Sequence, residues 1–187
     1  PISTISTYCE KLPQFLLYAL VIQVGLNLGA NAELGKMIKD IRFSSLLLPF
    51  FTIIGTLVFS AAASLLLTSW NIYDCMAVGS GFAYYSLSSL LIVQLKEASA
   101  GIEIASQLGA IALLANIIRE MLALFGAPLY ASFFGKFAPV SVAGINSMDV
   151  CLPVISRYSG KSIVPVAIIH GIILEISVPL LISLFCK

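Results

Sequence analysis

Long apolar segments separated by short polar stretches make up most of this chain. Six segments hold about 20 mostly apolar residues each, the length at which an α-helix spans the hydrocarbon core of a bilayer. They cover approximately residues 13–30, 43–68, 75–95, 102–126, 138–156 and 163–186. The pattern predicts an all-α polytopic membrane protein with about six transmembrane helices, in which residues 1–187 form a single transmembrane domain.

Two of these segments contain residues that interrupt helices. In the third segment, Gly79 and Gly81 precede a run of hydroxyl-bearing side chains, and in the fifth, Gly144 and Asn146 come shortly before Pro153. Gly and Pro are poor helix formers, and Asn offers the backbone competing hydrogen bonds. We therefore expect broken helices in the third and fifth spans. Unwound backbone at membrane depth is tolerated only inside protein or beside a water-filled cavity.

The overall composition agrees with a membrane protein and excludes other classes. The chain is 59% hydrophobic and only 10% charged, whereas soluble domains carry about 25% charged residues. A net charge of +1 without a basic patch argues against nucleic-acid binding. The four cysteines are too scattered for a metal site, so we expect neither a metal nor another cofactor. The first segment lacks a signal-peptide cleavage site, and we do not expect it to be one.

The distribution of Lys and Arg predicts how the chain is oriented. Cytoplasmic loops of membrane proteins are enriched in these residues. The loops after the first, third and fifth segments hold Lys36, Lys39, Arg42, Lys96, Arg157 and Lys161. The opposite side holds Lys11, Lys136 and Lys187. We therefore expect both termini to lie outside the cytoplasm.

Acidic residues inside the apolar segments are the main functional candidates. Asp149 lies near the middle of the fifth segment, and Glu120 lies in the fourth, with Asn116 four residues earlier on the same helical face. A charge at the membrane centre costs about 2.5–3.5 kcal/mol on insertion scales, and such residues commonly mark a transport path. We expect Glu120 and Asp149 to face a shared aqueous pocket. The alternative for Asp149 is a packed helix contact in which a neighbouring hydroxyl binds the acid.

Other polar residues are candidates for a supporting role. His170 and Glu175 lie five positions apart and therefore point about 140° apart on an ideal helix, so one site is not expected to use both. A lone buried His is more often a packing residue than a proton relay. Arg119 either binds within the protein or extends outward to the membrane surface. The remaining candidates are Tyr85, Ser86, Asn146 and Ser147.

Four blocks of sequence carry a resemblance to a known family. The blocks are GFAYYSLSS (81–89), LLANIIRE (113–120), MDVCLPVISRYSG (148–160) and PVAIIHGIIL (165–174). In this order they resemble the bacterial L-lysine exporter family of the LysO type. The resemblance implies a transporter of the inner membrane that exports L-lysine and its analogues. It also implies that a pair of intramembrane acids acts in transport, and these fall on Glu120 and Asp149.

The resemblance also implies partners. Typical members are longer and begin with two further helices, so this chain resembles their larger C-terminal part. A small two-span membrane protein would then supply the missing helices, or homo-oligomerisation would close the site.

Export of a net positive solute works against the membrane potential, at about 2.3 kcal/mol per charge per 100 mV. An inward proton offsets this cost, so we expect proton antiport in which lysine and a proton compete for the acids; Na⁺ coupling is the alternative. Half-helix N-termini and amides near Asn146 would hold the α-carboxylate.

The competing interpretations are a carrier for another small cation or organic anion and a non-transporting membrane subunit. An enzyme is not expected, since His170 and Ser86 form only a weak Ser–His pair.

Overall fold

The structure is a computed structural model that describes residues 43–67 and 69–186, together with Ile22 and Leu26. The expected first span and the Lys- and Arg-rich loop that follows it lie outside the described residues. Within the described residues every regular element is helical, in agreement with the all-α prediction.

Three long helices run through the molecule: α3 (Phe43–Ala63), α6 (Ile102–Phe134) and α9 (Val164–Phe185). Among the described residues, two helical stretches have the length and hydropathy to cross a membrane, Ile102–Phe134 and Lys161–Phe185, and α3 adds the shorter apolar stretch Leu47–Ala63. The 33 residues of α6 extend for about 50 Å at the helical rise.

The end of α6 differs from the sequence prediction. The fourth span was expected over about 102–126, ending just before Pro128, whereas α6 continues through this residue to Phe134. A proline removes one backbone hydrogen bond and usually ends or kinks a helix, but membrane helices accommodate proline more readily than soluble ones.

The third predicted span forms a helical hairpin instead of one crossing. It consists of α4 (Ile72–Gly79) and α5 (Tyr85–Ala100), joined by five non-helical residues. Phe82 and Ala83 both have positive φ angles, 44° and 74°. The Lys96 Nζ near the end of α5 lies 2.7 Å from the Asp74 Oδ1 at the start of α4. The chain therefore reverses direction here, and the prediction of a single span over 75–95 was wrong in this respect.

The fifth predicted segment is divided into short helices. It consists of α7 (Ala138–Ala143), the 3₁₀ helix η1 (Gly144–Met148) and α8 (Leu152–Ser159), after which η2 (Lys161–Ile163) leads into α9. Gly144, with φ of 62°, ends α7.

Two apolar clusters show how the long helices run relative to one another. Leu108 of α6 and Phe185 of α9 belong to one cluster, together with α4 and α5. Ala123 of α6 and Ala167 of α9 belong to the other, together with α7 and α8. Helices α6 and α9 are therefore antiparallel. Since α7 follows the end of α6 and α8 precedes the start of α9, the segment that contains α7 and α8 leaves and returns at one end of the molecule.

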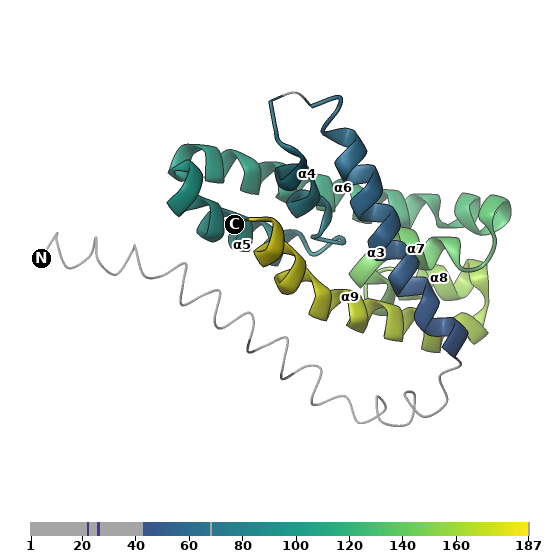
Figure 1. Cartoon of the computed structure of the whole chain (residues 1–187). Coiled ribbons are helices and arrows are strands. Elements are labelled where there is room, and N and C mark those ends of the chain that lie inside the picture. The colour runs from purple at the N-terminus through teal and green to yellow at the C-terminus, as the bar shows by residue number, and fades with distance from the viewer. Residues whose placement is uncertain (1–21, 23–25, 27–42, 68, 187) are drawn as a thin grey trace, which may run out of the picture.

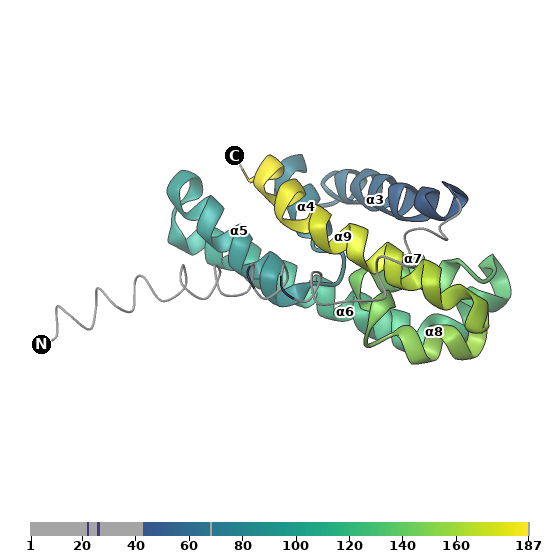
Figure 2. The same cartoon turned by 90° about the horizontal axis from the view of Figure 1, so that it is seen from below.

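The α4–α5 hairpin and a second hairpin, formed by α7, η1 and α8, lie at opposite ends of the bundle, as Figures 1 and 2 show. Their turns meet near the middle, where the Ile145 N–H donates to the Phe82 carbonyl at 3.0 Å. Gly144 allows this approach, because a Cβ at this position would overlap the Phe82 oxygen.

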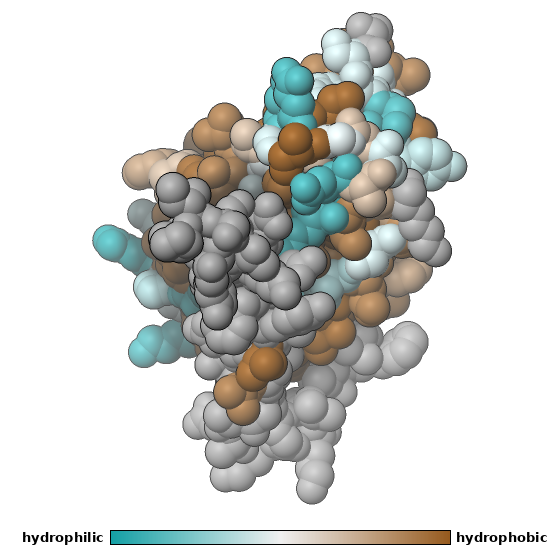
Figure 3. Space-filling view, turned by 90° about the vertical axis from the view of Figure 1, so that its left-hand side faces the viewer, coloured by the Kyte–Doolittle hydropathy of each residue, from teal (hydrophilic) through white to brown (hydrophobic). Residues whose placement is uncertain are grey.

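The surface carries many exposed large apolar side chains. Phe59, Phe125 and Phe133 are each more than three-quarters exposed, at 78%, 79% and 77%. Figure 3, which looks at the molecule from the end where α5 lies, shows hydrophobic side chains over much of the described surface. Extensive exposed apolar surface marks a membrane or protein interface, and a membrane fits the helix lengths.

Candidate functional site

The two acids that the sequence favoured lie near the turn that follows η1. Asp149 comes directly after this 3₁₀ helix and is exposed, and its Oδ1 accepts a hydrogen bond from the Val150 N–H. Glu120 is half-buried on α6. Both carboxylates lie within electrostatic range of the Cys151 thiol at the start of α8.

Glu175 joins these two acids. It lies on α9 and is the most buried of the three, with 7% of its surface exposed. Asp149 lies within electrostatic range of Glu175, and both lie within range of Tyr84. We call Glu120, Asp149 and Glu175 the acidic group. None of the three forms a salt bridge with another described residue. The one ion pair among the described residues joins Asp74 and Lys96.

Asn116 holds the turn between α4 and α5. Its Oδ1 accepts from the Ala83 N–H at 2.7 Å, and its Nδ2 donates to the Ala112 carbonyl at 2.8 Å. Gly81 makes room for this side chain, since a Cβ there would overlap the Asn116 amide. Asn116 therefore supports the unwound backbone, one helical turn from Glu120.

Arg119 points into the protein and does not extend to the membrane surface. Its Nε donates to the Val142 carbonyl and its Nη2 to the Ser141 carbonyl, both at 3.0 Å. Its guanidinium lies 5.7 Å from the centre of the Phe82 ring. These carbonyls belong to the C-terminal end of α7, where the helix dipole favours a cation.

His170 is fully buried and bound to hydroxyls on both sides. Its Nε2 lies 3.0 Å from the Thr52 Oγ1 and its Nδ1 lies 3.2 Å from the Ser147 Oγ. Ser147 donates to the Ala167 carbonyl. These contacts connect α3, η1 and α9 and agree with the packing interpretation of this histidine.

The remaining sequence candidates make fewer contacts. Tyr85 is exposed and Ser86 is half-buried at the start of α5. Asn146 is buried, and its carbonyl accepts from the Asp149 and Cys151 amides. The Leu152 amide donates to the Asp149 carbonyl. Because these amides and that of Val150 are already bound, they are not free to hold a carboxylate as the sequence suggested.

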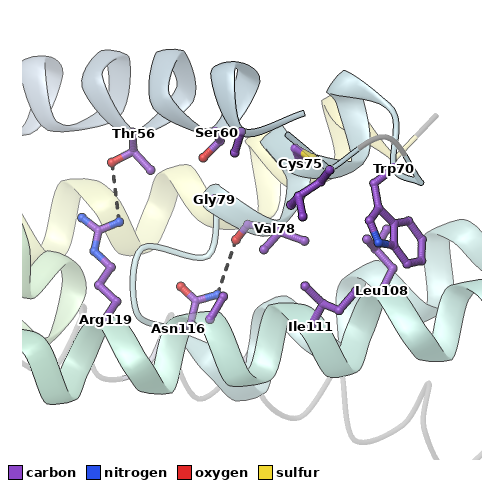
Figure 4. Close-up of a pocket in the computed structure, with 13 residues that line it drawn as sticks. Thr56, Ser60, Trp70, Cys75, Val78, Gly79, Leu108, Ile111, Asn116 and Arg119 are labelled. Carbon is purple, nitrogen blue, oxygen red and sulfur yellow. Dashed lines mark hydrogen bonds between the residues drawn. The ribbon is translucent and has the colours of Figure 1, made fainter. Parts of the chain in front are cut away.

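Two neighbouring cavities lie beside α3, with volumes of about 270 Å³ and 670 Å³. Both are lined by Thr56, Ser60, Ala63 and Arg119, and Figure 4 shows Arg119 extending from α6 toward Thr56 on α3. None of the acidic group lines either cavity. Sequence reasoning missed the hydroxyls of α3, although Thr52, Thr56 and Ser60 follow one another at four-residue intervals and thus share a helical face.

Comparison with known proteins identifies relatives over nearly the whole chain. The family described as Lysine exporter LysO matches residues 2–186. The Lysine exporter LysO of Escherichia coli is 28% identical over 180 residues, which cover 95% of this chain but only 56% of the E. coli protein. The Putative lysine exporter of Haemophilus influenzae is 27% identical over 173 residues, covering 91% of this chain and 82% of that protein. No solved structure shows significant similarity.

Proposed function

Since the chain belongs to the lysine exporter LysO family, we propose that it acts as a transporter domain that exports L-lysine and close cationic analogues across the inner membrane. The observation that supports this proposal is that Asp149 follows an interrupted helical segment, with Glu175 of α9 within electrostatic range of it and Glu120 of α6 within range of the neighbouring Cys151. Discontinuous helices of this kind build the binding sites of many secondary transporters.

The charges of the acidic group suit the substrate. Lysine carries two ammonium groups, and each needs a counter-charge where water is scarce. Glu120 and Asp149 supply two carboxylates near the turn after η1, and Glu175 adds a third on the facing helix. The sequence ranked Glu175 as a supporting residue, and we include it in the proposed cation site because it is buried on α9 within electrostatic range of Asp149.

Export requires an energy source. The membrane potential opposes the exit of a net positive solute by about 2.3 kcal/mol per charge per 100 mV. In the proposed cycle, a proton from outside binds a carboxylate of the acidic group, weakens its hold on the ammonium and releases lysine. The proton then leaves to the cytoplasm, so protonation and lysine binding alternate at one group. Sodium in place of the proton is the alternative.

The proposed topology has four crossings, by the first predicted span, α3, α6 and α9, and two hairpins that enter from opposite faces. One face then holds Lys36, Lys39, Arg42, Lys136, Arg157 and Lys161, and the other holds Lys11, Lys96 and Lys187. The first face is cytoplasmic by its positive charge. Compared with the six-span prediction, Lys96 moves to the outer face and Lys136 moves to the cytoplasmic face. The number of positive residues on each face is therefore unchanged, and both termini still lie outside.

Transport by reconstituted vesicles tests the function. Purified chain is incorporated into vesicles loaded with radiolabelled L-lysine, and efflux is measured with an opposing proton gradient, with a sodium gradient and with neither. We expect the proton gradient to accelerate lysine efflux and Glu120→Gln to abolish it. The matched control is Glu97→Gln, which removes an exposed acid at the end of α5. Efflux no faster than from protein-free vesicles would refute the proposal, and acceleration by sodium alone would assign the coupling to Na⁺.

We also propose that a partner chain completes the transporter. The chain spans about half the length of the E. coli relative, and a small two-span membrane protein or a second copy of this chain would complete the site. Co-purification of such a partner, and a higher efflux rate in its presence, would support this.

A further inference from the structure

We propose that Arg119, with Thr56 and Ser60, forms a separate subsite that binds the carboxylate of the transported amino acid. This inference rests on the proposed function and adds to it the way in which the anionic end of the substrate is recognised. The starting observation is that the mostly apolar walls of the two cavities beside α3 include Arg119, Thr56 and Ser60 and, within the part of the chain that the structure describes, no acidic residue.

The hydrogen-bond donors of Arg119 are only partly used. A guanidinium has five N–H groups in a planar fork. The Nε donates to Val142 and one Nη2 proton donates to Ser141, while the Nη1 has only a long contact, 3.5 Å, to the Thr56 hydroxyl. The edge formed by Nη1 and Nη2 therefore keeps donors directed toward the cavity. This edge matches the two oxygens of a carboxylate.

The charge of Arg119 calls for an anion. Among the described residues, no carboxylate lies within salt-bridge distance of this guanidinium. The carbonyls at the end of α7 offer only partial negative charge. An uncompensated cation inside a membrane protein is costly and usually indicates a functional site. A bound carboxylate would supply the missing charge.

The hydroxyls of α3 complete the subsite. Thr56 and Ser60 face α6 from one side of α3 (Figure 4) and line both cavities with Arg119. Gly79 of α4 allows Ser60 to lie here, because a Cβ at Gly79 would overlap the Ser60 hydroxyl. Hydroxyl donors beside a guanidinium are suited to the remaining lone pairs of a carboxylate.

Two members of the acidic group, Asp149 and Glu175, lie within electrostatic range of the turn against which this subsite is built. Arg119 lies against the ring of Phe82, and two residues later Tyr84 lies within electrostatic range of Asp149 and Glu175. The turn between α4 and α5 is thus bordered by a positive region and a negative region. An amino acid with a cationic side chain carries a negative carboxylate for the first region and positive ammonium groups for the second. The backbone amides near Asn146 are already hydrogen-bonded within their own turn, so Arg119 is the better candidate for binding the carboxylate.

Direct binding measurements test the subsite. The purified full chain in detergent is titrated calorimetrically with L-lysine and with L-lysinamide, which keeps both ammonium groups but lacks the carboxylate. We expect the wild-type chain to bind lysine roughly 10- to 100-fold more tightly, the range of a charge-assisted hydrogen-bonded pair. In Arg119→Gln this preference should vanish, while the affinity for lysinamide stays within about twofold of that of the wild-type chain.

Controls separate the subsite from a structural role of Arg119. Lys136→Gln removes a cation that lies over the Phe137 ring outside both cavities, and it should keep the preference for lysine. If Arg119→Gln does not fold, Thr56→Val should still reduce lysine binding and spare lysinamide binding. Equal binding of both ligands by the wild-type chain, or an equal loss of both in Arg119→Gln and Thr56→Val, would overturn the subsite alone. Binding of neither ligand by the wild-type chain would refute the proposed function as well.

Discussion

Replacing Asn116 by alanine tests whether one side chain supports the turn between α4 and α5. The Ala83 N–H donates to the Asn116 Oδ1 at 2.7 Å, and Ala83 is only 1% exposed. In Asn116→Ala this amide loses its partner in a place that water does not reach. An orphaned buried donor costs about 1–3 kcal/mol. The contact with the Ala112 carbonyl adds little, because this oxygen lies within a helix and keeps its backbone bond.

The side chain also occupies the space beside Gly81, where even a Cβ would overlap it. Its removal leaves a void that adds to the destabilisation. We therefore expect the variant to lose at least about 1–3 kcal/mol of unfolding free energy and to transport poorly, since the displaced turn borders the acidic group. Gln107→Ala is the matched control, because Gln107 is an exposed amide on the same helix, and it should change stability by no more than about 0.5 kcal/mol.

Unfolding is followed by the fluorescence of Trp70, the single tryptophan of the chain, which lines the cavity beside α4. Denaturant titrations of the wild-type chain and both variants in the same detergent give the differences in free energy. Equal stability of Asn116→Ala and Gln107→Ala would refute the reasoning, because the Ala83 amide would then not depend on Asn116.

Three further predictions concern the charges and the topology. Asp149→Asn and Glu175→Gln should each abolish lysine efflux from vesicles while the protein stays in the membrane; normal efflux from both amides would contradict the acidic group. Lys96→Met should lose about 3–5 kcal/mol of unfolding free energy because it leaves the buried Asp74 carboxylate without its counter-ion, and pairing it with Asp74→Asn should restore part of the loss; no difference between the single and double variants would contradict the ion pair. Single cysteines in the α5–α6 turn and at the exposed end of α8 should react with a membrane-impermeant reagent from opposite faces, and labelling of both from outside intact cells would contradict the four-crossing topology.

The long helices were predictable because hydropathy is a local property of the chain. The stretches expected over 102–126 and 163–186 correspond to α6 and α9, and only the continuation past Pro128 was missed. The reversal between α4 and α5 was not predictable in the same way. It depends on two residues with positive φ and on an ion pair between positions 74 and 96, and both features need the fold before they can be recognised.

In the candidate site, too, some features could be predicted from the sequence and others required the fold. Acids inside apolar segments are visible in any sequence, so Glu120, Asp149 and Glu175 were all identified before the structure was known. The partners of Arg119 are backbone carbonyls, which have no signature in the sequence. The hydroxyls of α3 did have one, since Thr52, Thr56 and Ser60 follow one another at four-residue intervals in a mostly apolar helix.

The single backbone hydrogen bond between Phe82 and Ile145 has a mechanical consequence. Within the part of the chain that the structure describes, it is the one hydrogen bond that directly joins the two turns, and such a bond contributes only about 0.5–1.5 kcal/mol. Phe82 and Ile145 also belong to one apolar cluster, so side-chain packing holds the two turns together in addition to this bond. Parting the two turns therefore uncovers two buried apolar side chains as well as breaking the bond.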